Sequence, residues 1–176
     1  MTLTSYRLNI CGFPNSPALK EQNLGIRDQR VALEWLRDNI SGFGGDPEHI
    51  VLGSQSSGAD TGSAMMYSHA DDPIVVGLGF QSGSVQIINA ATEEVDSEFV
   101  HVAQLVGCAD SSDRTKEFEC MQSIDAVVLK QTVSNKTFNL FGDPAGGSPM
   151  VDNVTLFTLD EYTRRGKEGQ FTKLVS

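Results

Sequence analysis

The sequence predicts an α/β protein with a mostly parallel β-sheet, because short apolar runs alternate with helical segments. Residues 49–53 (HIVLG) and 74–80 (IVVGLGF) are short apolar runs with β-branched residues, as buried parallel strands are. Apolar residues at three- and four-residue steps predict a helix over 26–40, and a small-residue segment over 57–69 predicts a second helix between the two runs. Strands that alternate with helices in this way form a parallel sheet with helices packed on it.

The rest of the chain adds one early strand and further helices. Residues 5–11 (SYRLNIC) have the pattern of a short strand, and Gly and Pro residues predict a loop over 12–24. The stretch SGFGGDP at 41–47 ends the first helix. Beyond residue 80 we expect helices over 92–106 and 113–131, a Gly/Pro-rich loop over 138–150, a charged helix near 159–166 and a terminal apolar run at 171–175.

Composition excludes several classes of protein. The 176 residues suffice for one domain with a sizeable core, and an apolar content of 39% argues against a disordered chain. A net charge of −10 argues against a nucleic-acid partner, because phosphate binding needs a basic patch. The sequence contains no run of 18 apolar residues, so we expect no membrane span. No metal-ligand spacing or nucleotide-binding pattern is present, so we expect no metal and no cofactor.

A few residues bear on the cellular compartment. Residues 1–10 (MTLTSYRLNI) lack the basic and apolar regions of a signal peptide. Asn39, Asn135 and Asn153 each begin an N-x-S/T sequon, which is a glycosylation candidate in a secreted protein. The cysteines are Cys11, Cys108 and Cys120. Their odd number leaves at least one without a partner inside this chain.

The stretch VLGSQSSGAD at 51–60 has the pattern of a strand-to-helix turn that presents a serine. A serine hydroxyl is a poor nucleophile until a base removes its proton. A sharp turn exposes the hydroxyl and directs the following backbone N–H groups at the developing oxyanion. The residues two positions away must be small, and here they are Ser54 and Gly58. Ser56 is therefore a candidate nucleophile, although Ser54 replaces the first glycine of the usual G-x-S-x-G pattern.

A purely structural role would explain the same residues. Serine-rich turns often precede helices, where a serine side chain caps the first N–H groups. Ser56 or Ser57 would then be an N-cap without a catalytic role. The motif alone does not choose between the two interpretations.

The flanking residues resemble the type-B carboxylesterase family, which includes cholinesterases and fungal lipases. The matching stretches, in order, are SYRLNICGFP (5–14), EQNLGIRDQRVALEWLRDNISGFGGDPEHI (21–50), the serine turn at 51–60 (the elbow), QSGS (81–84), Gly107-Cys108 with Cys120-Met121, and SPMVD (148–152). The resemblance covers essentially the whole chain, and residues 21–58 are its most specific part. It implies a partial α/β-hydrolase fold, with a central mostly parallel sheet and flanking helices, truncated at both ends.

The resemblance also implies roles for individual residues at the turn. Ser56 falls on the nucleophile position, and Ser57 falls on the next position, whose backbone N–H helps form the oxyanion hole. Gln55 falls where the family often has glutamate or glutamine, next to the pocket. Ser54 departs from the family's glycine, which puts the geometry of the elbow in question.

The resemblance implies different roles for the three cysteines. Cys108 and Cys120 match a family disulfide that closes a short surface loop; the alternative is two free thiols in a reducing compartment. Cys11 replaces a position that is commonly aromatic, and we expect it to be a small buried apolar residue.

Other parts of the family's machinery have no match here. The glycine-rich oxyanion loop would precede the first strand, the triad acid would follow the segment that 171–176 resembles, and the catalytic histidine comes later still. We therefore expect an internal fragment. Its parts are a nucleophile-elbow region at 1–90, a helical and loop insert at 91–158, and the start of the next helix-strand unit at 159–176.

The three histidines of the chain do not replace the missing base. His49 precedes the elbow strand and is expected at its far end. His69 ends the elbow helix, about 18 Å from Ser56 along a helix axis with a rise of 1.5 Å per residue. His101 lies in the 92–106 helix, where it is most simply a surface or partly buried residue.

The resemblance implies hydrolysis of a small-molecule ester or lipid through an acyl-serine intermediate. We expect weak or no activity from the isolated chain, because the triad acts as a unit. The alternatives are a non-catalytic cholinesterase-like binding protein, although such proteins typically lose the serine, or a truncated gene product. The family is usually secreted, whereas this chain shows neither a signal peptide nor a signal of oligomeric state.

Overall fold

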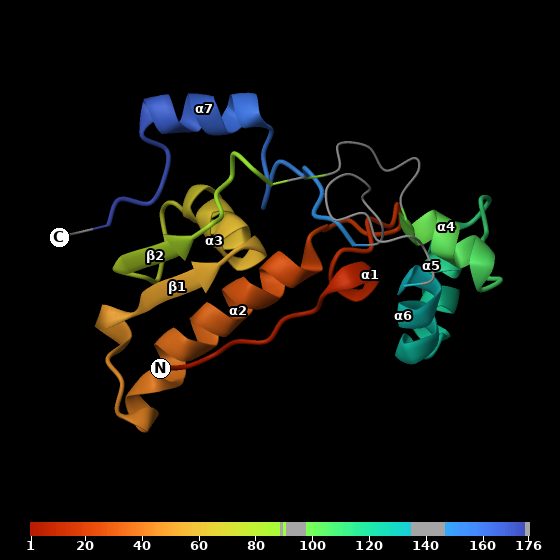
Figure 1. The fold of residues 1–176 in the computed structure, drawn as a ribbon, viewed down its shortest axis with the longest axis horizontal. Coiled ribbons are helices and arrows are strands. Elements are labelled where there is room, and N and C mark those ends of the chain that lie inside the picture. The colour runs from red at the N-terminus through yellow and green to blue at the C-terminus, as the bar shows by residue number, and fades with distance from the viewer. Residues whose placement is uncertain (89, 91–97, 135–146, 175–176) are drawn as a thin grey trace. The chain divides into compact units, whose positions relative to one another are not determined.

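Figure 1 shows a computed structural model of the chain, which describes residues 1–88, 90, 98–134 and 147–174. The chain divides into two compact units. Unit 1 comprises Met1–Ser5, Ile26–Ile88 and Val151–Ser176, and unit 2 comprises Tyr6–Gly25 and Asn89–Met150. Each unit is therefore assembled from segments that lie far apart in the sequence.

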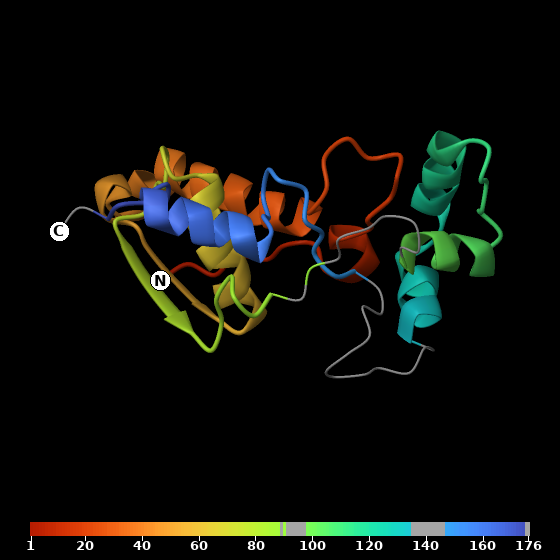
Figure 2. The same cartoon turned by 90° about the horizontal axis from the view of Figure 1, so that it is seen from above.

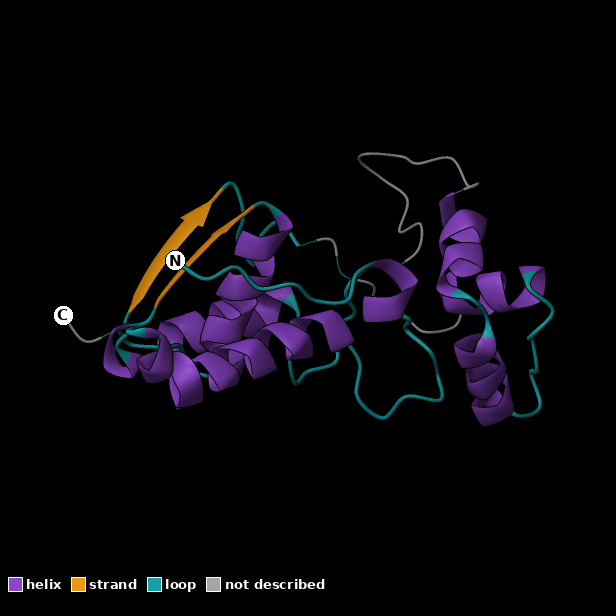
Figure 3. Cartoon of the chain, turned by 90° about the horizontal axis from the view of Figure 1, so that it is seen from below, coloured by secondary structure: helices purple, strands orange, loops and turns teal. Residues whose placement is uncertain are grey.

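Unit 1 contains the parallel sheet that the sequence predicts. Its elements are α2 (Leu24–Asn39, from Ile26 on in this unit), the short 3-10 helices η1 (Ile40–Phe43) and η2 (Pro47–His49), β1 (Val51–Gln55), α3 (Ser57–Ser68), β2 (Gly77–Gln81) and α7 (Leu159–Glu168). The two strands pair in parallel, from Val51 opposite Gly77 to Gln55 opposite Gln81. Figures 2 and 3 show α2 and α3 on the same side of this sheet. The helix-strand-helix-strand order predicted for residues 26–80 is confirmed.

The two faces of the sheet differ in burial. Leu52 and Ser54 of β1 are partly buried, and so is Phe80 of β2. A Cβ atom on Gly62 of α3 would lie 2.8 Å from the Phe80 ring and 3.3 Å from Ser54 Oγ, so this face packs closely on α3. Val51, whose side chain alternates to the opposite face, is 66% exposed.

The core of unit 1 lies around α2, α3 and α7. Its buried apolar residues are Ile26, Leu33, Ala59, Ala64, Met65, Met66, Val75, Val85, Leu156, Phe157 and Tyr162. Tyr67 of α3 meets Tyr162 of α7 edge to face, with ring centroids 5.0 Å apart. The Thr172 N–H also donates to Met66 O at 2.8 Å, so the C-terminal segment is tied to the end of α3.

Unit 2 is helical in the residues that the structure describes. It contains α1 (Asn9–Gly12), α4 (Glu98–Leu105), α5 (Arg114–Ser123) and α6 (Ala126–Ser134). Its core residues are Ile10, Phe99, Val102, Ala103, Cys108, Met121, Leu129 and Val133. Asn23 joins two distant segments of this unit, because its amide donates to Met150 O at 2.7 Å and accepts from the Met150 N–H at 2.8 Å.

Three local predictions are wrong. The expected strand at 5–11 is instead extended chain followed by α1; Asn9 has a φ of +54°, which breaks an extended path. The expected helix at 113–131 is two helices, because Asp125 accepts the Val127 N–H at 2.7 Å and caps a new start. Cys11 is exposed rather than buried.

The later helices and the Gly/Pro-rich loop are described in whole or in part. The 92–106 helix is described only from residue 98, as α4, and the 138–150 loop only from residue 147. The charged helix near 159–166 is α7. No helix in the described ranges is long and apolar enough to cross a membrane.

Candidate active site

Ser56 occupies a strained turn between β1 and α3. Its backbone angles are φ 54° and ψ −128°, a region that residues with a side chain rarely adopt. Such a conformation costs on the order of 1–3 kcal/mol and persists only where the surrounding structure holds it. A serine held in this way between a strand and a helix has the geometry of a nucleophile elbow.

The turn does not use Ser56 as a helix cap. Ser56 occupies the N-cap position of α3, but its side chain makes no capping hydrogen bond. An N-cap serine would accept the N–H of the second or third residue of the helix. Ser56 therefore does not act as the side-chain cap that the structural interpretation assigned to it.

Ser57 is the first residue of α3, so its N–H lies at the positive end of the helix. Within the described part of the chain this N–H donates no hydrogen bond. Behind it, Thr61 Oγ1 lies 3.1 Å from Ser57 O and 2.9 Å from Gln29 Oε1. The first turn of α3 is thus tied to α2, while the Ser57 N–H has no acceptor among the described residues.

The small residues around the turn explain how Ser54 is tolerated. A Cβ atom on Gly58 would lie 3.4 Å from Ser54 Cβ, which is ordinary contact. Gly62, one turn further along α3, leaves the space that the Ser54 hydroxyl occupies. Ser54 Oγ is buried and has no hydrogen-bond partner among the described residues. Gln55 ends β1 as an exposed residue.

A loop after β2 lies directly against the elbow. The Ser56 N–H donates to Gln81 O at 2.9 Å, and the Ser84 N–H donates to Asp60 Oδ1 at 2.8 Å. A Cβ atom on Gly83 would lie 2.5 Å from Ser56 O, so only glycine allows this approach. The sequence motif QSGS located this loop, but nothing in the sequence indicated that Asp60 would bind it.

The histidines of unit 1 engage other partners. His49 lies just before β1, where its Nδ1 is 2.6 Å from Asp46 Oδ2. His69 follows the last residue of α3, and its Nδ1 is 2.9 Å from Ser68 Oγ. Burial, followed by the charge of Arg30, lowers the pKa of His69. His101 is an exposed residue of α4 in unit 2. The described residues of unit 1 thus hold no histidine in contact with Ser56.

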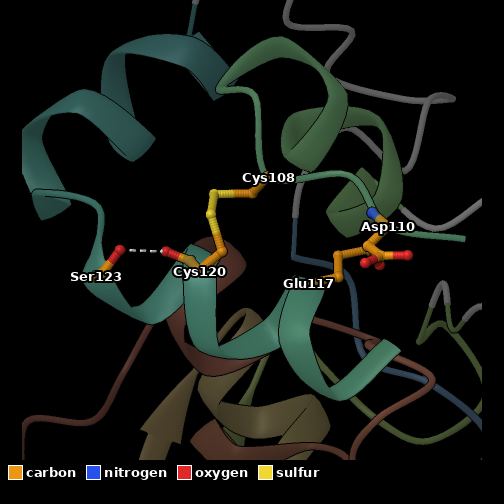
Figure 4. The surroundings of a disulfide bond; sticks show 5 residues. All are labelled: Cys108, Asp110, Glu117, Cys120 and Ser123. Atoms are coloured by element: carbon orange, nitrogen blue, oxygen red, sulfur yellow. Dashed lines mark hydrogen bonds between the residues drawn. A yellow bond between two sulfur atoms is a disulfide. The ribbon is translucent and has the colours of Figure 1, made fainter. Parts of the chain in front are cut away.

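The Cys108–Cys120 disulfide is present, as the resemblance implied. Its Cα atoms are 5.5 Å apart, and Figure 4 shows that it joins α5 to the segment after α4. Inside the closed loop, Glu117 is fully buried. It accepts from the Asp110 N–H and from Arg114 Nη1, each at 3.0 Å. The free-thiol alternative is not supported.

The other residues singled out in the sequence lie apart from the elbow. Asn39 and Asn153 are exposed, as a glycosylation acceptor must be, and Asn135 lies outside the described residues. Cys11 lines a largely apolar cavity of about 330 Å³ within unit 2. The described ranges contain no group of His, Cys, Asp and Glu that could hold a metal ion.

Comparison with known proteins agrees with this geometry. The carboxylesterase family matches residues 2–172. The chain is 38% identical over 175 residues to a chlorogenic acid esterase of Aspergillus niger, covering 99% of this chain and 33% of that protein. It is 33% identical over 168 residues to secreted lipase 5 of Gibberella zeae, covering 91% of this chain and 31% of that protein.

The chain spans about one third of the length of these curated relatives. Both relatives are ester hydrolases by name. The family implies an α/β-hydrolase fold, and the two-stranded parallel sheet is consistent with part of that fold. The family match extends over nearly all of the sequence and includes the strained serine turn and the disulfide loop. The chain belongs to the carboxylesterase family.

Proposed function

We propose that the protein is a serine carboxylic ester hydrolase with Ser56 as its nucleophile. The observation that carries this proposal is the backbone of Ser56, whose positive φ is kept at the β1–α3 turn although its side chain makes no capping hydrogen bond. Strain of this kind at a serine has a functional explanation, since it exposes the hydroxyl and aligns the next N–H groups.

In this mechanism, Ser56 Oγ attacks the carbonyl carbon of the ester while a base takes its proton. The tetrahedral oxyanion accepts hydrogen bonds from backbone N–H groups, including that of Ser57. The alcohol leaves with a proton, and an acyl-serine remains. Water then attacks the acyl-serine, which releases the carboxylic acid and restores the serine.

We also propose that the isolated chain hydrolyses esters slowly. His49 and His69 are engaged elsewhere in unit 1, so Ser56 lacks a neighbouring base among the described residues. A triad without its base loses most of its rate, and what is left comes from the oxyanion hole and binding. The names of the relatives support a small ester or a lipid as the substrate class.

We propose that the protein, like members of its family, is secreted. The Cys108–Cys120 bond supports this, because disulfides persist in oxidising compartments. The name of the secreted lipase from Gibberella zeae points the same way.

The experiment is hydrolysis of a p-nitrophenyl ester by the purified chain, with Ser56→Ala and Ser57→Ala compared. We expect a slow rate that Ser56→Ala abolishes. Ser57→Ala keeps its backbone N–H and should retain most of the rate. Equal rates in the wild type and Ser56→Ala would refute the nucleophile, whereas a fast rate that depends on Ser56 would refute the proposed weakness of the isolated chain.

A further inference from the structure

The nucleophile turn is joined to the end of β2 and to the loop that follows it. The Ser56 N–H donates to O of Gln81, the last residue of β2, at 2.9 Å, and the Ser84 N–H in the loop donates to Asp60 Oδ1 at 2.8 Å. Between these points Gly83 lies against Ser56 O, which a Cβ atom would approach to 2.5 Å. The loop thus contacts the elbow at Gly83 and Ser84, directly after the strand residue that binds the Ser56 N–H.

Asp60 connects this loop to Ser56 through its own backbone as well. It lies in the first turn of α3, and its N–H donates to Ser56 O at 3.0 Å. The same residue therefore binds the nucleophile with its main chain and the loop with its carboxylate. A Cβ atom on Gly83 would lie 2.7 Å from Asp60 Oδ1, so the carboxylate packs against the loop as well as accepting from it.

Both ends of this contact carry backbone strain. Ser56 has a φ of +54°, and so does Ser82 in the loop. Strained residues of this kind persist only where their surroundings hold them. The Ser56 N–H donates to Gln81 O, and Gln81 is followed directly by the strained Ser82. The bond from the Ser84 N–H to Asp60 therefore helps to keep Gln81 O where Ser56 needs it.

We propose that Asp60 is a positioning residue for Ser56, because its carboxylate holds the loop at 82–84, and with it the Gln81 end of β2, in the place where Gln81 O fixes the nucleophile turn. This inference rests on the proposed function for its catalytic meaning, but the structural contact can be measured without activity. The residue acts through the loop and touches no substrate.

The experiment measures amide hydrogen exchange at Ser56 and Ser84 by NMR, and the rate at which a fluorophosphonate forms an adduct on Ser56. Labelling is followed by intact mass and peptide mapping, with imidazole added as an external base. The variants are Asp60→Ala, Asp60→Asn, which keeps an oxygen acceptor, and Asp60→Glu, which keeps the charge but moves it. Asp113→Ala is the matched control, since Asp113 also accepts backbone N–H groups, but at the start of α5 in unit 2.

Asp60→Ala and Asp60→Glu should each speed exchange at Ser84 and Ser56 and slow labelling about tenfold, the effect of one lost hydrogen bond of this kind. Asp60→Asn should keep both the exchange rates and the labelling rate close to those of the wild type, and Asp113→Ala should change neither. Unchanged Ser56 exchange in a folded Asp60→Ala would overturn the proposal. If the wild type is not labelled at all, the proposed function fails, while the exchange of Ser56 and Ser84 still decides the role of Asp60.

Discussion

The Ser56 turn of unit 1 and the turn between α4 and α5 of unit 2 are held in place by different kinds of interaction. In unit 1 the Ser56 turn is held by hydrogen bonds and close contacts from residues more than 20 positions away, chiefly Gln81 and Ser84. In unit 2 the turn between α4 and α5 is closed by the Cys108–Cys120 bond and filled by Glu117, all within one short segment. The turn of the proposed nucleophile depends on non-covalent contacts with distant residues, whereas the other turn depends on a covalent bond and a buried carboxylate within its own segment.

Reduction of the disulfide should have the largest effect on stability, and only in unit 2. Opening a loop with a separation of 12 residues costs about 3 kcal/mol of unfolding free energy in the chain-entropy model. The measurement is amide exchange of α4 and α5 compared with α3, in oxidised and reduced protein, with Cys108→Ser/Cys120→Ser as a second form. Equal loss of protection in α3 would contradict the independence of the two turns.

Removal of Glu117 should be the next largest effect. Glu117→Ala leaves the Asp110 N–H and Arg114 without their shared acceptor, and we expect a loss of about 2 kcal/mol because these partly buried donors lose a charged acceptor and the buried side chain leaves a gap. Glu117→Gln, which keeps an acceptor, should lose less. Urea unfolding monitored in unit 2 tests this, and a Glu117→Ala chain as stable as the wild type would show that the buried carboxylate does not stabilise the loop.

Ser54→Ala should have a smaller effect of the opposite sign. The change removes a buried hydroxyl that has no partner among the described residues, and we expect a gain of about 1 kcal/mol. Ser63→Ala is the matched control, because Ser63 Oγ donates to Asp60 O at 2.8 Å and its loss should destabilise. Thermal unfolding of both variants separates them; a loss of stability in Ser54→Ala would mean that its hydroxyl is bonded.

The smallest effects concern pH, and they should have opposite signs in the two units. Burial raises the pKa of Asp60 above its ordinary 3.8, so its contribution to stability is greatest below pH 3.8 and falls as pH rises through the folded value. The backbone N–H of Lys116, followed by its side chain, lowers the pKa of Asp113, so that contribution is present above 3.8 and is lost as pH falls.

The melting temperatures of Asp60→Asn and Asp113→Asn between pH 2 and 7 test these signs. Relative to the wild type, Asp60→Asn should become more stable as pH rises, and Asp113→Asn less stable. The same sign for both variants would contradict the assigned environments of the two carboxylates.

The sequence predicted the parts of this fold that local patterns determine. The apolar periodicity of α2 and the small residues around Ser56 are local signals, and both elements occur where expected. The break between α5 and α6 also has a local signal, since Asp125 is a good N-cap residue, but the longer helical pattern over 113–131 hides it.

What the sequence could not supply were contacts between distant segments. The bond from Ser84 to Asp60 spans 24 positions, and that from Asn23 to Met150 spans 127. Neither has a periodicity or a motif of its own. The failed strand at 5–11 has the same origin, because a strand needs a neighbour to pair with and the described sheet consists of β1 and β2 alone.

The most direct test of the central claim is the site of fluorophosphonate attachment on the purified chain, measured by peptide mapping with increasing imidazole. Ser56 is proposed to be an aligned nucleophile without a base, so an external base should accelerate its reaction selectively. We expect an adduct on Ser56 that forms faster with imidazole, with Ser54 and Ser57 unmodified. An adduct distributed among these serines, or none on Ser56 at any imidazole concentration, would contradict the account.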